Sequence, residues 1–114
     1  MVRSQSADML PTLKDKTRYL AYEATSATPV RKEDVETAIT EALMRLSGGL
    51  GLAKAGVQFL PDWKSQRGIL RVSHTSVTEM KAALTLIGKV KITTATVASR
   101  GVSGVLNKAR SKFL

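Results

Sequence analysis

Residues 28–49 read TPVRKEDVETAITEALMRLSGG and form the most strongly patterned stretch of this 114-residue sequence. Apolar side chains recur at the three- and four-residue intervals of one helix face, at Val35, Ala38, Ile39, Ala42, Leu43 and Leu46. Pro29 suits a first helical turn, and the acidic residues that follow suit the positive end of the helix dipole. The stretch therefore predicts an amphipathic helix that ends at Ser47–Gly49, where glycine accepts the left-handed cap conformation.

Alternating apolar and polar residues on both sides of this helix predict β-strands. One strand is expected over residues 18–25, and two more over residues 54–60 and 67–73. A short polar segment, residues 61–66, joins the latter two, which we therefore expect to pair antiparallel.

A second helix is predicted from Ser76, because Ser76-Val77-Thr78-Glu79 has the form of a capping box. The residues alone allow two ends for this helix, one at Gly88 and one beyond Val90. A β-branched run over residues 94–97 predicts the last strand. A terminal helix is predicted after Gly101, with the side chains that face the body expected to be Val105, Leu106, Ala109 and Phe113.

The predicted order is strand, helix, strand, strand, helix, strand, and a terminal helix. Right-handed crossovers turn this order into a ferredoxin-like split βαβ sandwich, an α/β (α+β) fold with an antiparallel four-stranded sheet plus a C-terminal helix. Residues 1–16 lack any periodic pattern and are predicted to be an N-terminal arm, while residues 17–114 form one domain.

The composition excludes several classes of protein. Cysteine is absent, which excludes a disulfide scaffold, thiolate zinc sites and thiol catalysis. No apolar run is long enough to span a membrane, and no signal-peptide core follows the N-terminus. We therefore expect a cytoplasmic, soluble protein without a membrane partner.

Positive charge dominates the sequence, which carries 18 lysines and arginines and a formal net charge of +9. No acidic residue follows Glu79, whereas the basic residues after it are Lys81, Lys89, Lys91, Arg100, Lys108, Arg110 and Lys112. This balance points to a polyanion, above all a nucleic acid. Aromatic residues make up only 4% of the chain, so contacts to phosphates are expected rather than base stacking.

The sequence offers no convincing catalytic set. His74 is the only histidine, with no nucleophile or orienting carboxylate in view, and the carboxylates of the first helix have no histidine beside them. No catalytic residue, metal site or protein-bound cofactor is therefore predicted. Gly101-Val102-Ser103-Gly104 is compatible with a simple strand-to-helix turn or with a helix start that holds a phosphate.

Four segments together resemble a known family. The stretch LPTLKDKTRYL over residues 10–20, Arg67-Gly68-Ile69-Leu70-Arg71 followed by His74, the segment 101–104 and the ending RSKFL over residues 110–114 are similar to signatures of archaeal ribonuclease P protein component 2. That family is related to a eukaryotic processing-of-precursor subunit, and the four segments occur in its order and with compatible spacing.

The resemblance implies an RNA-recognition-motif-like sandwich in which the second helix runs past Gly88 to a turn near Ile92–Thr93. It implies a protein subunit of the ribonucleoprotein endonuclease that removes the 5′ leader from precursor tRNA, with catalysis and Mg²⁺ at the RNA subunit. The expected partners are ribonuclease P RNA, precursor tRNA and the barrel-shaped protein component 3, in a two-plus-two heterotetramer.

The predicted RNA-binding residues are Lys14, Lys16, Arg18, Arg67, Arg71, His74, Arg100, Ser103, Gly104, Lys108, Arg110 and Lys112. Three other functions stay open on the residues alone. One is a ribosomal or other tRNA-associated RNA-binding protein of the same fold, and another is an acylphosphatase-like small hydrolase. The third is a regulatory domain that binds a small ligand.

Overall fold

The structure is a computed structural model that describes residues 16–114, arranged around one antiparallel sheet. Its five strands lie in the order β3-β4-β2-β6-β5. The central strand β2 (Thr17–Ser26) pairs with β4 (Arg67–Ser73) on one side and β6 (Thr93–Ser103) on the other. The outer strands are β3 (Gln58–Lys64) and the two-residue β5 (Lys89–Val90). The predicted split βαβ arrangement is confirmed, with β5 as a fifth strand.

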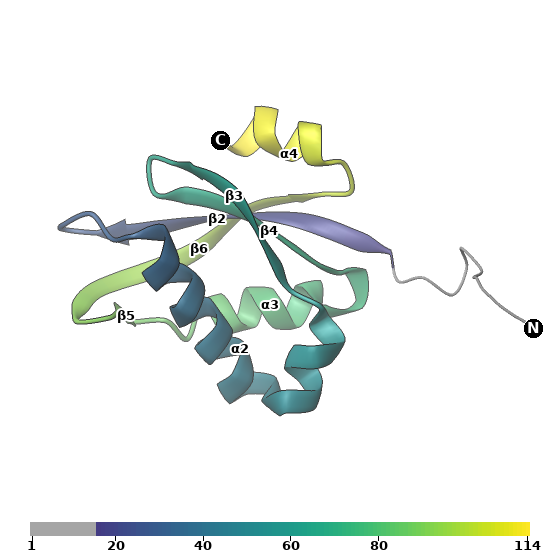
Figure 1. The fold of residues 1–114 in the computed structure, drawn as a ribbon, viewed down its shortest axis with the longest axis horizontal. Coiled ribbons are helices and arrows are strands. Elements are labelled where there is room, and N and C mark those ends of the chain that lie inside the picture. The colour runs from purple at the N-terminus through teal and green to yellow at the C-terminus, as the bar shows by residue number, and fades with distance from the viewer. Residues whose placement is uncertain (1–15) are drawn as a thin grey trace, which may run out of the picture.

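Helices cover both faces of the sheet. The longer helices α2 (Lys32–Ala55) and α3 (Val77–Leu84) lie on one face, and the C-terminal helix α4 (Leu106–Phe113) lies on the other (Figure 1). A short 3₁₀ turn, η2 (His74–Ser76), leads from β4 into α3. Within residues 16–114, no helix is both long and apolar enough to cross a membrane.

Each face of the sheet has its own core, because successive side chains on a strand point to opposite faces. Leu20, Tyr22 and Ala24 of β2 point toward α2 and α3, where they join the main core with Ile39 and Met80. On the other face, buried Ala21, Ile69 and Ala109 form a small second core, against which Tyr19, Leu60, Leu106, Phe113 and Leu114 pack. The predicted inward side chains of the terminal helix are thus confirmed except for Val105, which is 49% exposed.

The predicted end of the first helix is wrong. Gly48 does interrupt the helix, with φ 72° and ψ −177°, but the helix resumes and ends at Gly56 in the left-handed conformation. Residues 54–55 are therefore helical, and the following strand starts at Gln58 and continues through Pro61 to Lys64. The turn to β4 is reduced to Ser65–Gln66, both of which have positive φ.

Three further details differ from the sequence prediction. The hydroxyl of Ser76 makes no capping hydrogen bond. The carboxylate of Glu79 does not cap the helix either, but accepts a hydrogen bond from Ser47 Oγ of α2 at 2.6 Å. Helix α3 ends at Leu84, before Gly88, so it does not run on toward Ile92. Residues 101–103 belong to β6, which delays the terminal helix to Leu106.

Candidate nucleic-acid interface

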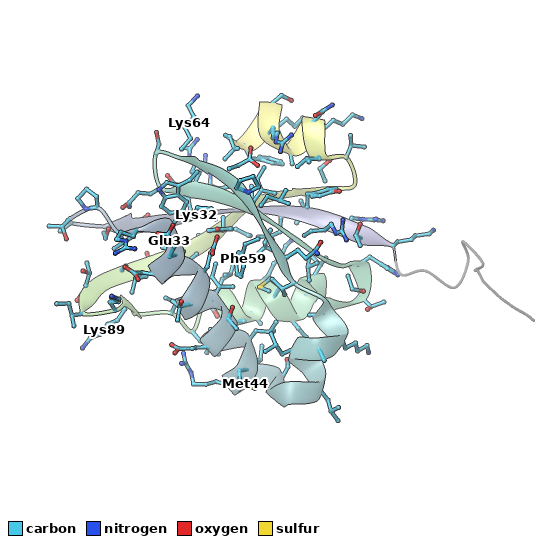
Figure 2. The ribbon with its side chains drawn as sticks, viewed as in Figure 1. Lys32, Glu33, Met44, Phe59, Lys64 and Lys89 are labelled. Carbon is cyan, nitrogen blue, oxygen red and sulfur yellow. The ribbon has the colours of Figure 1, made fainter. Side chains whose placement is uncertain are left out.

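The sheet face that carries α4 is rich in basic side chains. We call this surface the α4 face and define it by Lys64, Arg67, Arg71 and Arg100 of the strands with Lys108, Arg110 and Lys112 of α4. Figure 2 shows Lys64 extending on the same side of the sheet as α4. The acids of the α4 face are Glu23 and Asp62, and both are ion-paired with its arginines.

Strand register gathers the sheet residues of this face into a row. Lys64 lies opposite Arg67, and Arg67 lies opposite Glu23, across three neighbouring strands. Arg67 and Arg71 have the same parity as Ile69 of the second core, so all three point toward α4. Arg100 joins the row because the pairing of β2 with β6 shifts at this point, between Ala21 and Tyr22. Such a shift re-aims a side chain.

Glu23 holds two arginines of the α4 face. Its Oε2 lies 3.2 Å from Nε of Arg67, and its Oε1 lies 3.3 Å from Nη1 of Arg100. Because Glu23 is 27% exposed, each pair contributes at most about 1 kcal/mol. The pairs fix the direction in which the guanidinium groups point. Glu23 was not predicted as a site residue, because its parity with Ala21 was the only signal in the sequence.

Arg110 fastens α4 to the outer strand β3. Its Nε and Nη2 donate hydrogen bonds to the two carboxylate oxygens of Asp62, at 2.9 and 3.1 Å. This hydrogen-bonded carboxylate raises the pKa of Arg110 further above its usual range. Arg110 was predicted to contact a phosphate, but its guanidinium group already makes a bidentate pair with Asp62.

Two side chains on α4 complete the docking of the helix. Ala109 is fully buried against the sheet. Phe113 lies over Gly101 so closely that a Cβ at this glycine would collide with the aromatic ring. Lys108 and Lys112 remain exposed, as predicted from the sequence.

Arg71 is less accessible than the sequence prediction implied. It is only partly exposed, and its Nε is buried without a hydrogen-bond partner among the described residues. Gly68 leaves no space for a ligand, because Tyr22 packs over it and its hydroxyl oxygen would lie 2.6 Å from a Cβ there.

A second group of predicted residues lies where β2 begins. The backbone N–H of His74 donates to the carbonyl of Lys16 at 2.8 Å, and both side chains are exposed. Nη1 of Arg18 would lie 3.8 Å from a Cβ at Gly104, so this arginine adjoins the turn before α4. The hydroxyl of Ser103 accepts the N–H of Val105 at 3.0 Å, which favours the simple turn over a phosphate-holding helix start. Lys14 lies outside the described residues.

The basic residues of the C-terminal third do not form one surface. Lys81 is on α3, Lys89 is in β5, and Lys91 follows β5, where its Nζ lies 3.8 Å from Oδ1 of Asp34. Most described acids share this helical side of the molecule: Glu33, Asp34, Glu36 and Glu41 on α2 and Glu79 on α3. The α4 face is thus the more positive side of the described molecule.

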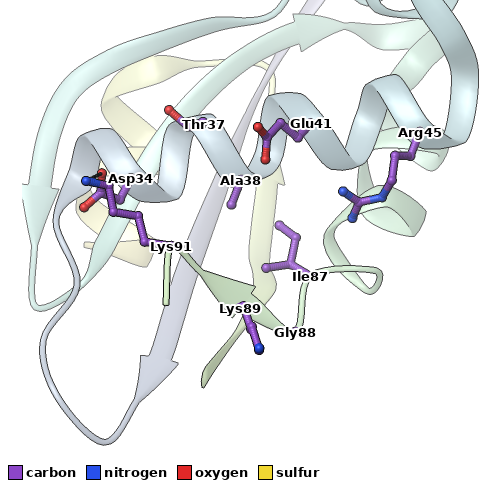
Figure 3. Close-up of a pocket in the computed structure, with 9 residues that line it drawn as sticks. All are labelled: Asp34, Thr37, Ala38, Glu41, Arg45, Ile87, Gly88, Lys89 and Lys91. Carbon is purple, nitrogen blue, oxygen red and sulfur yellow. Dashed lines mark ion pairs between the residues drawn. The ribbon is translucent and has the colours of Figure 1, made fainter. Parts of the chain in front are cut away.

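A hollow on the helical side does not resemble an active site. It has a volume of about 430 Å³ between α2 and the segment around β5 (Figure 3). Its ionisable lining residues are Asp34, Glu41, Arg45, Lys89 and Lys91, with neither a histidine nor a serine among the described lining residues. Across residues 16–114, no group of three or more histidine or acidic side chains is placed to hold a metal ion.

Comparison with known proteins identifies the family. A family model of the Rpp14/Pop5 family matches residues 18–114. The chain belongs to this family. Ribonuclease P protein component 2 of Thermococcus gammatolerans is 40% identical over 99% of this chain and 95% of the relative, and that of Thermococcus kodakarensis is 35% identical over the same shares. The Methanosarcina acetivorans protein of this name is 34% identical over 93% of the chain and 80% of the relative.

A solved structure confirms the fold of this Rpp14/Pop5 member. A chain in the cryo-EM structure of yeast ribonuclease MRP matches with a TM-score of 0.66, covering 82% of this chain and 77% of that one. At 17% identity, the likeness concerns the fold alone. The predicted class, a ribonuclease P protein subunit, is confirmed by the family and its archaeal relatives, and the ribosomal and hydrolase alternatives are not favoured.

Proposed function

We propose that this Rpp14/Pop5 protein binds ribonuclease P RNA through the α4 face and assists the catalytic RNA as it removes the 5′ leader from precursor tRNA. The observation that carries the proposal is the uneven distribution of charge between the two sides of the sheet. Phosphate groups favour a cationic surface whose few acids are already neutralised by arginine. The helical side suits phosphates less well, because five carboxylates, four of them on α2, offset much of its positive charge.

The phosphate contacts are proposed at Lys108, Lys112 and Lys64, which are exposed and have no ion-pair partner among the described residues. Arg67 and Arg100 add contacts on the uncovered part of the sheet. Arg110 acts differently, because it positions α4 through Asp62. Lys16, Arg18 and His74 are proposed as a second contact at the start of β2.

Catalysis is proposed to belong to the RNA subunit, with its Mg²⁺, and not to this chain. Where RNA strands approach each other closely, their phosphates repel one another. The cluster of basic side chains lowers this repulsion. The barrel-shaped component 3 is the proposed protein partner, in a two-plus-two heterotetramer that acts in the cytoplasm.

Reconstituted cleavage tests this function. Ribonuclease P RNA and component 3 are assayed on precursor tRNA with and without this chain, over a range of Mg²⁺ concentrations. The chain is expected to raise the cleavage rate and to lower the Mg²⁺ concentration needed for half-maximal rate. An unchanged rate at every Mg²⁺ concentration would contradict the proposal, as would cleavage by the chain without any RNA subunit.

A further inference from the structure

Arg71 differs from the other arginines of the α4 face in having no acidic partner. The three others are paired with Glu23 or Asp62. Arg71 forms neither an ion pair nor a side-chain hydrogen bond with any described residue. Its positive charge is therefore the one guanidinium charge on this face that no carboxylate of residues 16–114 compensates.

The strand pairing explains why no acid lies beside Arg71. Strand β4 has a neighbour on each side, and Arg71 lies opposite Tyr19 of β2 and Gln58 of β3. Tyr19 in turn lies opposite Ser103 of β6. This row across four strands contains no carboxylate, whereas the row through Arg67 contains Glu23.

The side chain of Arg71 is held in place up to its guanidinium group. Its Nε is buried without a hydrogen-bond partner among the described residues, although the residue as a whole is partly exposed. The terminal nitrogens Nη1 and Nη2 therefore form the part that faces solvent. A charged fork whose stem is already covered loses little conformational freedom when it binds a ligand.

Packing alone does not account for an arginine at this position. A buried donor without an acceptor lowers stability, and such groups in folded proteins require an explanation. The exposed end of the fork provides one, since two parallel N–H groups match the two oxygens of a phosphate or a carboxylate.

Gln58 adds a neutral donor beside this fork. It has the same parity as Leu60 of the second core, so its side chain lies on the α4 face with that of Arg71. Gln58 is exposed, and its amide makes no hydrogen bond with the described residues. The two neighbouring side chains thus offer N–H donors to one anion from adjacent strands.

We infer that Arg71 and Gln58 hold one backbone phosphate of ribonuclease P RNA, with Nη1 and Nη2 of Arg71 each donating to a phosphate oxygen. The inference rests on the proposed function, because RNA is the polyanion that the α4 face is proposed to bind. The lysines of α4 act as point charges, whereas a guanidinium fork requires one orientation of the phosphate. Arg71 is therefore a positioning contact that fixes how the RNA lies on the sheet.

Replacement by lysine separates geometry from charge. Arg71→Lys is expected to weaken binding of ribonuclease P RNA by about tenfold, the loss of one charge-assisted hydrogen bond. The slope of log K against log salt should stay at the wild-type value, because the positive charge remains. Arg45→Lys makes the same chemical change at an exposed position on α2 and is expected to leave binding unchanged. The midpoint of thermal unfolding of Arg71→Lys should be no lower than that of the wild type, since a buried unpaired donor is removed.

A second variant leaves Arg71 in place and supplies the missing carboxylate. Gln58→Glu keeps the shape of an exposed side chain and puts an acid opposite the fork. It is expected to weaken RNA binding by about tenfold and to reduce the salt slope by about 0.9, because Arg71 is then neutralised. Ala82→Glu adds the same charge at an exposed position of α3 and should change both quantities far less.

The outcomes separate this inference from the proposed function. Wild-type affinity in either Arg71→Lys or Gln58→Glu, with the wild-type chain still binding the RNA, overturns the inference alone. Weaker binding by Arg71→Lys together with a lower unfolding midpoint overturns it as well, because Arg71 then supports the fold. Failure of the wild-type chain to bind ribonuclease P RNA overturns the proposed function too.

Discussion

Tyr22 is the largest fully buried side chain among residues 16–114, and its hydroxyl group is poorly accommodated. The ring packs edge-on against Phe59, with centroids 6.4 Å apart, and fills the space over Gly68. The hydroxyl is buried without a hydrogen-bond partner among the described residues. Burial, and to a lesser extent the charge of Glu36, raises the pKa of Tyr22 far above its usual value.

Tyr22→Phe is therefore expected to maintain or increase the free energy of unfolding at pH 7, by up to about 1 kcal/mol, since it removes an unpaired polar group. The folded wild-type protein keeps the phenolic proton, whereas the unfolded chain releases it above pH 10. Wild-type stability should thus fall as the pH rises beyond 10, and the variant should lose less. Urea titrations at pH 7 and pH 10.5 measure both effects. A variant less stable by more than 1 kcal/mol would contradict this account of Tyr22.

Glu23 is the acid at the centre of the α4 face, where it pairs with Arg67 and Arg100. Glu23→Gln is expected to cost less than about 1 kcal/mol of stability, because these pairs are partly exposed. It should also tighten RNA binding and steepen its dependence on salt, since a negative charge is removed beside the phosphates. Asp34→Asn, which makes the same charge change on the helical side, is the control in RNA titrations at several salt concentrations. Equal effects of the two variants would contradict the proposed interface.

At the scale of elements, α4 is a short helix whose position depends on one glycine and one ion pair. Gly101→Ala is expected to displace Phe113 and to lower stability by about 1–3 kcal/mol, the usual cost of overpacking. Gly104→Ala serves as the control, because its nearest neighbour lies at 3.8 Å. Thermal unfolding and proteolysis at the C-terminus measure the change. Equal stability of the two variants would mean that α4 does not dock through Phe113.

The elements also show which parts of the fold can be predicted from the sequence. Strand β4 was predicted with its observed bounds, because its alternation is uninterrupted between two turn segments. Gly48 misled the prediction, since it does break the helix locally, while packing of Leu52 and buried Ala55 onto the core restores it. Pro61 was taken for a loop residue, although an edge strand tolerates proline.

The candidate site was harder to predict than the fold, because it depends on register. Seven of the predicted residues do lie on or beside the α4 face: Arg67, Arg71, Arg100, Ser103, Lys108, Arg110 and Lys112. No local sequence pattern predicts that Glu23 pairs with arginines from two other strands, or that Asp62 pairs with Arg110. These contacts arise only when segments 44 and 48 residues apart in the sequence are brought together.

At the scale of the whole molecule, the central claim is that RNA binds the α4 face and not the helical side. Two pairs of charge reversals separate these surfaces while changing the net charge equally. Lys108→Glu with Lys112→Glu alters the α4 face, and Lys54→Glu with Lys81→Glu alters the helical side, all at exposed positions.

The decisive measurement is the salt dependence of ribonuclease P RNA binding by these two double variants and the wild type. The α4 pair is expected to weaken binding and to reduce the slope of log K against log salt by about 0.9 for each lost phosphate contact. The helical pair should keep nearly the wild-type slope. An equal loss in both variants, or a larger loss in the helical pair, would contradict the claim that RNA lies on the α4 face.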